Sequence, residues 1–130
     1  MVLVDTSVWV DLLSKRPKYK PNESQLLNLV TCGPVLQEVL QGLRSHEFAG
    51  PFQNSFLAIP SIGLPVTRDL YLHAATIYRL GKTKGYTIRS SIDCLIAAIA
   101  MEYKVPVWHY GRDFSSISRY TSLDEFSHFP

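Results

Sequence analysis

The chain has 130 residues, of which 46% are hydrophobic and 18% charged, and its net charge is +2. This composition excludes an intrinsically disordered chain, and the small net charge does not by itself indicate a nucleic-acid-binding protein. No apolar run approaches the ~20 residues of a membrane-spanning helix, and the apolar run at residues 2 to 4 is too short for the core of a signal peptide. We therefore expect a cytoplasmic protein in which residues 1–130 form a single domain.

Asp5 follows the first predicted strand directly. Residues 2 to 4 are consecutive apolar residues, two of them β-branched, which is typical of a short strand buried on both faces of a sheet. Ligands of open α/β sheets bind beyond the carboxyl ends of the strands, which makes Asp5 a candidate site residue. The same position also suits a residue that caps the following helix, alone or with Thr6 or Ser7. The local pattern leaves both interpretations open.

The next stretch combines a short helix with a basic loop. Residues 8, 9, 12 and 13 are apolar at helical spacing, and the helix is expected to end before Pro17. Cations then gather in this loop and again around residues 82 to 89, without acids among them. Such groups suit contact with a polyanion at a defined place, although a solvated surface is an equal alternative for each. The cations of the two groups are Lys15, Arg16, Lys18, Lys20, Lys82, Lys84 and Arg89, and Arg112 is a further candidate for contact with a polyanion.

Asn22 and Gln25 resemble a capping box that opens a short helix, and residues 29 to 32 suit either the end of that helix or a strand. The pair Gly33 and Pro34 then punctuates the chain and opens a helix through residue 43. Glu38 lies at the border of its apolar face, where an acid is either a solvated edge residue or part of a site.

Three phenylalanines spaced four residues apart form an aromatic stripe if residues 47 to 57 are helical, although Pro51 disfavours a regular helix there. Such a stripe is either core or a docking surface for a partner helix. The stripe consists of Phe48, Phe52 and Phe56.

The second half contains two predicted helices and a strand. Thr67 caps a helix that is expected to end near Gly81, and residues 92 to 101 are apolar around nearly the whole circumference of a helix, which predicts a buried central helix. Asp93 is its only charge and lies in the first turn, where the helix dipole favours an anion. Residues 105 to 110 form a further strand, and Asp113 follows its end. Cys32 and Cys94 are expected to be reduced, buried thiols.

Strand and helix alternate along the chain, which predicts an α/β fold in which helices cover both faces of a mainly parallel sheet. Strand ends and helix starts share one edge of such a sheet, so Asp5, Glu38, Asp93 and Asp113 converge there. Clustered carboxylates stay ionised only beside a cation, and ligand sets of oxygen atoms select Mg²⁺ or Mn²⁺. A metal-dependent phosphodiesterase follows, with the basic loops contacting flanking phosphates.

Four stretches carry a resemblance to a known family: VLVDTSVW at 2–9, QEVLQGL at 37–43, IRSSIDCLIA at 88–97 and HYGRDF at 109–114. In their order and spacing they resemble a PIN domain of the VapC type, a toxin ribonuclease of toxin–antitoxin pairs. The resemblance spans nearly the whole chain. It implies a three-layer α/β/α fold, an endoribonuclease that depends on Mg²⁺ or Mn²⁺, a homodimer, and inhibition by a small VapB-like antitoxin, for which Phe48, Phe52 and Phe56 are candidate contacts.

The resemblance also implies roles for individual residues. Asp5, Glu38 and Asp93 match the metal-binding catalytic acids of the family, and Ser7, with Thr6 beside it, matches a supporting hydroxyl. The family often has an acid two residues before Asp113, where this chain has Gly111, so Asp113 is either the fourth acid or a supporting residue. The implied reaction is attack of metal-activated water on an RNA phosphodiester, which leaves a 5′-phosphate and a 3′-hydroxyl. An RNA- or protein-binding module with weak or no catalysis is the alternative.

Overall fold

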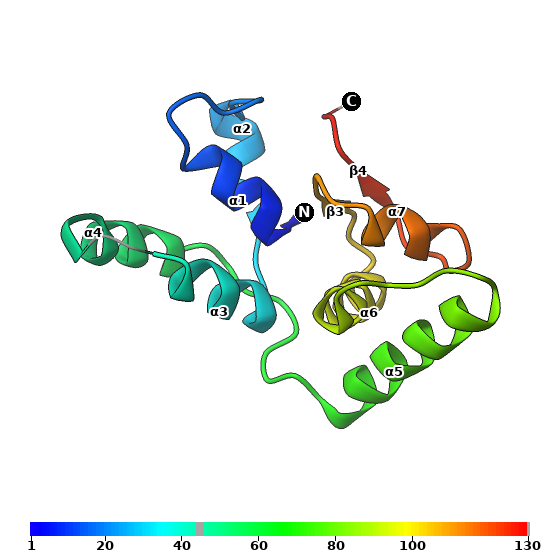
Figure 1. The fold of residues 1–130 in the computed structure, drawn as a ribbon. Coiled ribbons are helices and arrows are strands. Elements are labelled where there is room, and N and C mark those ends of the chain that lie inside the picture. The colour runs from blue at the N-terminus through cyan, green and yellow to red at the C-terminus, as the bar shows by residue number, and fades with distance from the viewer. Residues whose placement is uncertain (44–45, 130) are drawn as a thin grey trace.

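The fold is built on a four-stranded, fully parallel sheet in the order β2-β1-β3-β4. The computed structural model describes residues 1–43 and 46–129 (Figure 1). The strands are β1 (Val2–Val4), β2 (Leu29–Val30), β3 (Val107–Trp108) and β4 (Glu125–Phe126). The predicted parallel sheet is confirmed, and residues 29 and 30 are a strand, which decides the alternative that the sequence left open.

β1 lies in the middle of the sheet because it pairs with β2 on one side and β3 on the other. Leu3 and Val4 are completely inaccessible to solvent, as expected for a central parallel strand covered on both faces. Asp5 is the first residue beyond this strand, and its amide donates to the carbonyl of Trp108. The most buried strand therefore delivers a carboxylate directly to the carboxyl edge of the sheet.

Four helices occupy the first half of the chain: α1 (Thr6–Leu12), α2 (Glu23–Leu26), α3 (Gly33–Gln41) and α4 (His46–Leu57). The capping box predicted at α2 is present, because Asn22 and Gln25 exchange hydrogen bonds between side chain and backbone. α4 continues through Pro51, so the expected interruption does not occur. α3 and α4 extend together away from the sheet (Figure 1).

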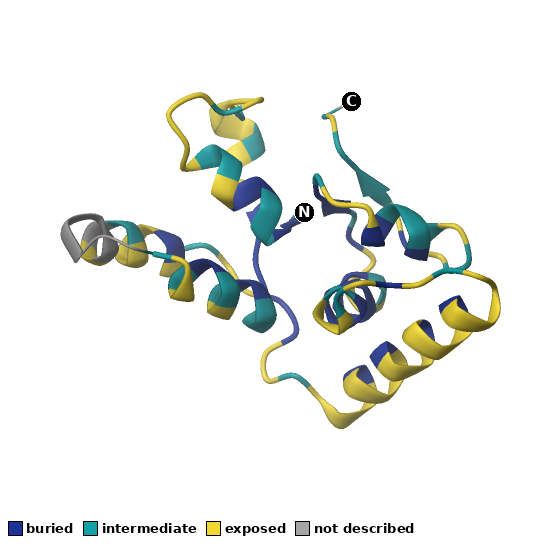
Figure 2. Ribbon diagram, viewed as in Figure 1, coloured by how far each residue is buried: buried dark blue, intermediate teal, exposed yellow. Residues whose placement is uncertain are grey.

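Three helices complete the fold: α5 (Arg68–Thr83), α6 (Ser91–Tyr103) and α7 (Asp113–Ser118). α6 is the predicted central helix, and every residue from Cys94 to Ala100 is buried (Figure 2). Thr67 caps α5 as predicted. The helix runs two residues past Gly81, because this glycine does not end the helix: a Cβ at Gly81 would lie 2.3 Å from the hydroxyl oxygen of Tyr120, so glycine permits close packing there.

Helices cover both faces of the sheet, which confirms the predicted α/β class. Cys32 and Cys94 are both buried and unpaired, as predicted. Within residues 1–43 and 46–129, no helix has the length and apolar character needed to cross a bilayer.

Candidate active site

Asp5 is buried, with 7% of its surface exposed, and it is the N-cap of α1. Its Oδ2 accepts a hydrogen bond of 2.6 Å from the Ser7 hydroxyl and another of 3.2 Å from the Ser7 amide. Ser7 Oγ in turn accepts from the amide of Tyr110 at 3.1 Å. Capping uses Oδ2 alone, and Oδ1 makes no hydrogen bond to the described residues. Asp5 can therefore cap a helix and still offer one oxygen to a ligand.

Glu38 lies in the second turn of α3, the helix that was predicted to open at Gly33 and Pro34. It still reaches the edge of the sheet because α3 packs against the start of α1, where the Thr6 hydroxyl donates to Glu38 Oε1 at 3.2 Å. Burial raises the pKa of Glu38, the Thr6 hydrogen bond lowers it, and the charge of Asp5 raises it further. Glu38 is thus held beside Asp5 although 33 residues separate them in the sequence.

Asp93 and Asp113 form a pair at the starts of α6 and α7. Asp113 is buried, and its two oxygens accept hydrogen bonds from the amides of Arg89 at 3.1 Å and Ser90 at 2.9 Å. Burial, reinforced by the charge of Asp5, by Asp113 and by the charge of Glu38, raises the pKa of Asp93 to about 8.

Gly111, where the resembling family often has an acid, is exposed, and a Cβ built there would meet no atom within 4 Å. Its backbone also lies outside the left-handed region. Neither space nor conformation therefore requires glycine at this position, and an acid would fit without strain.

The four carboxylates come from the end of β1 and from the helices α3, α6 and α7, whose starts surround the carboxyl edge of the sheet (Figure 1). Asp93 experiences the charges of Asp5, Asp113 and Glu38. The ion pair found in the described part of the chain joins His109 and Glu125 instead, at 2.5 Å. The four carboxylates therefore lie close enough for their charges to interact, and no Lys or Arg of the described residues forms an ion pair with them.

A hard divalent cation fits this set of donors, because carboxylate oxygens are its preferred ligands and its charge would relieve the repulsion that raises two of the pKa values. The side chains are not gathered as tightly as a metal site requires: within residues 1–43 and 46–129, no three His, Cys, Asp or Glu residues stand close enough to hold an ion. The ion that fits the chemistry would have to draw Asp5, Glu38 and Asp93 together.

The candidate RNA-binding cations are all exposed, but only some adjoin the acids. Arg89 donates its amide to Asp113, and Arg112 precedes it. Lys18 reaches the same region from the loop after α1, where its Nζ lies 4.6 Å from the centre of the Tyr110 ring. The other loop cations, Lys15, Arg16 and Lys20, share the loop of Lys18. Lys82 and Lys84, at the end of α5, contact none of the four acids through the described side chains.

The aromatic stripe of α4 is not a uniform docking surface. Phe56 is 1% exposed and packs edge-on against Trp9 with ring centres 5.0 Å apart, so its assignment as a partner contact is wrong: it is core. Phe52 is half-buried and stacks on Phe56. The side chain of Phe48 lies outside the described residues. Phe52 alone remains a described candidate for partner contact.

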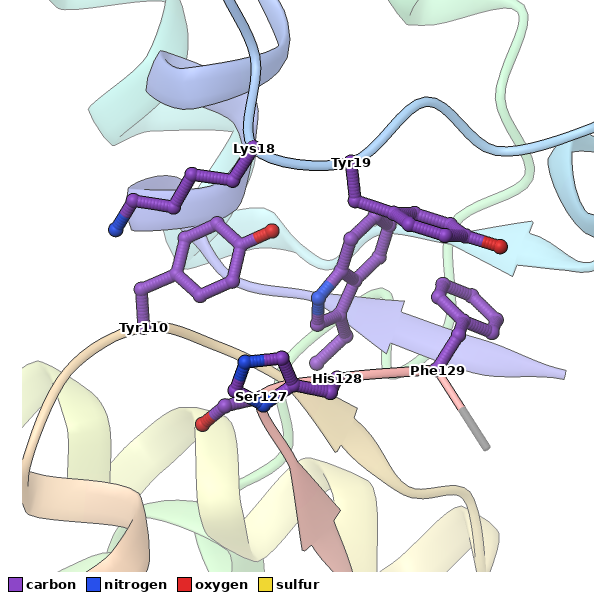
Figure 3. Close-up of a pocket in the computed structure, with 7 residues that line it drawn as sticks. Lys18, Tyr19, Tyr110, Ser127, His128 and Phe129 are labelled. Carbon is purple, nitrogen blue, oxygen red and sulfur yellow. The ribbon is translucent and has the colours of Figure 1, made fainter.

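Beside the acids lies a pocket that the sequence analysis did not predict (Figure 3). It has a volume of about 340 Å³. Trp108 and Tyr110 are two residues apart at the end of β3, so their side chains point to the same face of the extended chain. This spacing is the part of the pocket that the sequence indicates. The remaining walls come from segments that no local pattern connects. The pocket is lined by Lys18, Tyr19, Trp108, Tyr110, Ser127, His128 and Phe129.

Comparison with protein families and curated proteins gives consistent results. The PIN domain model matches residues 2–120. The protein named VapC ribonuclease Mb1587 from Mycobacterium bovis is 31% identical over 133 residues, with 98% of each chain covered. The protein named ribonuclease VapC11 from Mycobacterium tuberculosis matches with the same identity and coverage.

Solved structures share the fold at lower identity. VapBC-1 from nontypeable Haemophilus influenzae has a TM-score of 0.70 at 18% identity and covers 97% of both chains. FitAB bound to a DNA fragment has a TM-score of 0.69 at 20% identity, covering 97% of this chain and 94% of that one. VapBC-5 from Mycobacterium tuberculosis has a TM-score of 0.67 at 20% identity, covering 95% of each.

Proposed function

The chain belongs to the PIN-domain family, and on this basis we propose that residues 1–130 form one nuclease domain, the VapC-type ribonuclease toxin of a toxin–antitoxin pair. Relatives named VapC ribonucleases match it over 98% of its length, so the proposal concerns the whole chain. The observation that carries the chemistry is the convergence of four carboxylates, without a neutralising Lys or Arg among the described residues, at the carboxyl edge of a parallel sheet.

Asp5, Glu38 and Asp93 are proposed to hold Mg²⁺ or Mn²⁺. Bound there, such an ion supplies a Lewis acid that activates water and neutralises charge on a phosphate. Ser7 fixes the orientation of Asp5 by two hydrogen bonds, and Thr6 contacts Glu38 by one. These contacts support the ligand geometry before an ion arrives, which lowers the cost of assembling the site.

Asp113 is proposed to position the site, and to be a direct ligand only if one of its oxygens is released. Both oxygens already accept backbone hydrogen bonds from residues 89 and 90, which lie just before α6. Through these bonds Asp113 fixes the start of the helix that carries Asp93.

The proposed substrate is RNA, and the exposed cations closest to the acids suit its phosphates. Lys18 lies over the Tyr110 ring, the backbone of Arg89 contacts Asp113, and Arg112 directly precedes Asp113 in the chain. Lys15, Arg16 and Lys20 would extend this positive surface along the loop after α1, whereas Lys82 and Lys84 would contact RNA only at a distance from the reaction.

The proposed partners are a small VapB-like antitoxin and a second copy of this chain. Complexes named VapBC and FitAB have the same fold, which supports an antitoxin partner. Among the described side chains of the aromatic stripe, Phe52 of α4 is the candidate for this contact, because it is only half-buried.

The central test replaces Asp5 by Asn. Purified protein with Mg²⁺ or Mn²⁺ is expected to cleave cellular RNA, and Asp5→Asn is expected to abolish cleavage because it removes the charge that holds the ion. Asn caps helices about as well as Asp, so circular dichroism and the melting temperature should change little.

The matched control is Asp69→Asn, which removes an exposed acid in the first turn of α5 and should leave cleavage unchanged. Undiminished cleavage by Asp5→Asn, or by the wild type in excess chelator, would refute the metal site. If the wild type binds RNA but does not cleave it with either metal, the alternative of a binding module is favoured. The observation behind this alternative is Gly111, which stands where the family often has an acid.

A further inference from the structure

The pocket beside the acids is formed by three segments that are distant in the sequence. Lys18 and Tyr19 come from the loop after α1, Trp108 and Tyr110 from the end of β3, and residues 127 to 129 follow β4. Its volume of about 340 Å³ is at the lower end of the ~300–1,000 Å³ of small-ligand pockets. A helix, with a diameter of ~10–12 Å, is too wide for it. The pocket suits one flat ring system.

The pocket walls are aromatic. Tyr19 stacks on Phe129 with ring centres 5.3 Å apart, and Trp108 meets both Tyr19 and Tyr110 edge-on at 6.0 and 6.2 Å. Figure 3 shows Tyr110 on one side of the hollow and Tyr19 with Phe129 on the other, with His128 between them. Unpaired bases stack on such rings, and every base has a ring face to offer.

The indole of Trp108 forms part of this wall and lies beside the Tyr110 ring. Burial and the charge of Asp11 raise the pKa of Tyr110, and an interaction with the Trp108 side chain lowers it.

Lys18 adds a positive charge at this pocket. Its Nζ lies 4.6 Å from the centre of the Tyr110 ring, while its amide donates to Asp11 at 2.9 Å and so fixes the loop in place. Lys15, Arg16 and Lys20 belong to the same loop. An aromatic hollow with cations beside it matches a nucleotide, whose base is flat and whose phosphate is anionic.

The pocket is connected to the candidate metal site by two hydrogen bonds. The amide of Tyr110 donates to Ser7 Oγ at 3.1 Å, and the Ser7 hydroxyl donates to Asp5 Oδ2 at 2.6 Å. We infer that this pocket receives one unpaired base of the RNA strand beside the phosphate that is cut, with Lys18 contacting an adjoining phosphate. The inference rests on the proposed function and adds to it a site that selects the base.

Direct binding can be tested without catalysis. Full-length Asp5→Asn protein in chelator is titrated with short homopolymeric RNAs of A, C or U, and the two indole N–H resonances are followed by NMR. The Trp108 resonance should shift with at least one RNA. The Trp9 indole, which packs against Phe56, is the internal reference and should not move. Absence of a Trp108 shift with all three RNAs, or equal shifts of both indoles, would overturn the inference.

Variants of Tyr19 separate stacking from simple packing. Tyr19→Phe keeps the ring and should bind RNA within about twofold of wild type, whereas Tyr19→Leu keeps apolar bulk and should bind about tenfold more weakly, because a stacked base is lost. Tyr71→Leu, on exposed α5, is the matched control and should bind normally. Equal binding by Tyr19→Leu and wild type would contradict the inference.

Cleavage assays then distinguish this inference from the proposed function. On RNAs that vary the base at each position around the cut, Tyr19→Leu should raise KM about tenfold and weaken the preference at one position, with kcat nearly unchanged. If the wild type cleaves RNA and Tyr19→Leu shows the same base preference, the base-binding role of the pocket is refuted and the proposed nuclease activity stands. Wild-type protein that fails to cleave, while RNA still shifts Trp108, would overturn the nuclease and support the pocket.

Discussion

Each carboxylate of the candidate site is held in a different way. Asp5 accepts from Ser7, Glu38 accepts from Thr6, and Asp113 accepts from two backbone amides. Asp93 is partly buried, and the charges of the three other acids act on it. It is therefore the residue whose protonation is most sensitive to its surroundings, and its pKa is raised to about 8.

Asp93 should make the metal-free protein less stable as the pH rises. Its ordinary pKa is 3.8, so between about pH 4 and about pH 8 the folded protein holds a proton that the unfolded chain has released. The free energy of unfolding therefore falls across this range, and the contribution from the protonated form is lost above about pH 8. We expect the melting temperature in chelator to decrease across this window, and Asp93→Asn to flatten the decrease and raise the melting temperature at its upper end.

The control for this measurement is Asp69→Asn, whose exposed side chain lies on α5, and which should keep the wild-type dependence on pH. If Asp93→Asn shows the same slope as wild type, Asp93 does not hold the proton. Adding Mg²⁺ to the wild type should also reduce the slope, because an ion replaces the proton as the compensating charge.

At the scale of elements, Asp113 connects α7 to α6. It is the first residue of α7, and it accepts the amides of residues 89 and 90 just before α6 begins. Ser90, the N-cap of α6, makes no capping hydrogen bond with its own side chain. The carboxylate of Asp113 thus supplies acceptors that the start of the most buried helix lacks.

Asp113→Asn should therefore lower stability as well as activity. An amide group offers one oxygen in place of two, so one backbone N–H loses its partner, which costs ~1–3 kcal/mol when buried. Differential scanning calorimetry should show a lower melting temperature for Asp113→Asn than for Asp5→Asn. Equal melting temperatures for the two variants would mean that Asp113 has no structural role beyond that of Asp5.

Individual elements show which parts of the fold a sequence can predict. α6 and β1 were predictable because full burial requires apolar residues at every position, and this pattern is local. The end of α5 was predicted to within two residues, but the role of Gly81 was not, because the need for glycine there arises from Tyr120, almost 40 residues away. A local pattern cannot distinguish a glycine that ends a helix from one that permits close packing.

The same limit applies to the candidate site. The shared edge of Asp5, Asp93 and Asp113 follows from the alternation of strand and helix, so the sequence predicted their convergence. The approach of Glu38 to Asp5 could not be derived from its position in the helix, because it depends on how α3 packs against α1. The aromatic pocket was not predicted at all, because Tyr19, Tyr110 and Phe129 meet only through the order of the strands.

At the scale of the whole molecule, α3 and α4 extend together away from the sheet (Figure 1), and residues 53 to 55 of α4 are exposed. Phe52→Glu should weaken binding of an antitoxin without unfolding the domain, because Phe52 is only half-buried. Phe56→Ala should instead lower the melting temperature, since removal of a buried phenylalanine costs ~3–5 kcal/mol.

Complex formation can be measured by isothermal titration with the purified antitoxin. Gln53→Glu, an exposed neighbour on α4 with the same added charge, is the matched control and should bind normally. Unfolding of Phe52→Glu would show that Phe52 is also core. Normal binding by a folded Phe52→Glu would remove this part of α4 from the partner surface.

The position of β1 between β2 and β3 has a consequence for how the protein is made. Asp5 donates its amide to Trp108, and Ser7 accepts from Tyr110, which is 103 residues further along the chain. A ribosome therefore releases Asp5 and Glu38 long before the strand that completes their surroundings. Contacts of such long range form slowly and late. For the ribonuclease proposed here, a nascent or prematurely terminated chain would carry catalytic acids but no assembled site. RNA in the producing cell would therefore be cleaved only after synthesis of the chain is complete.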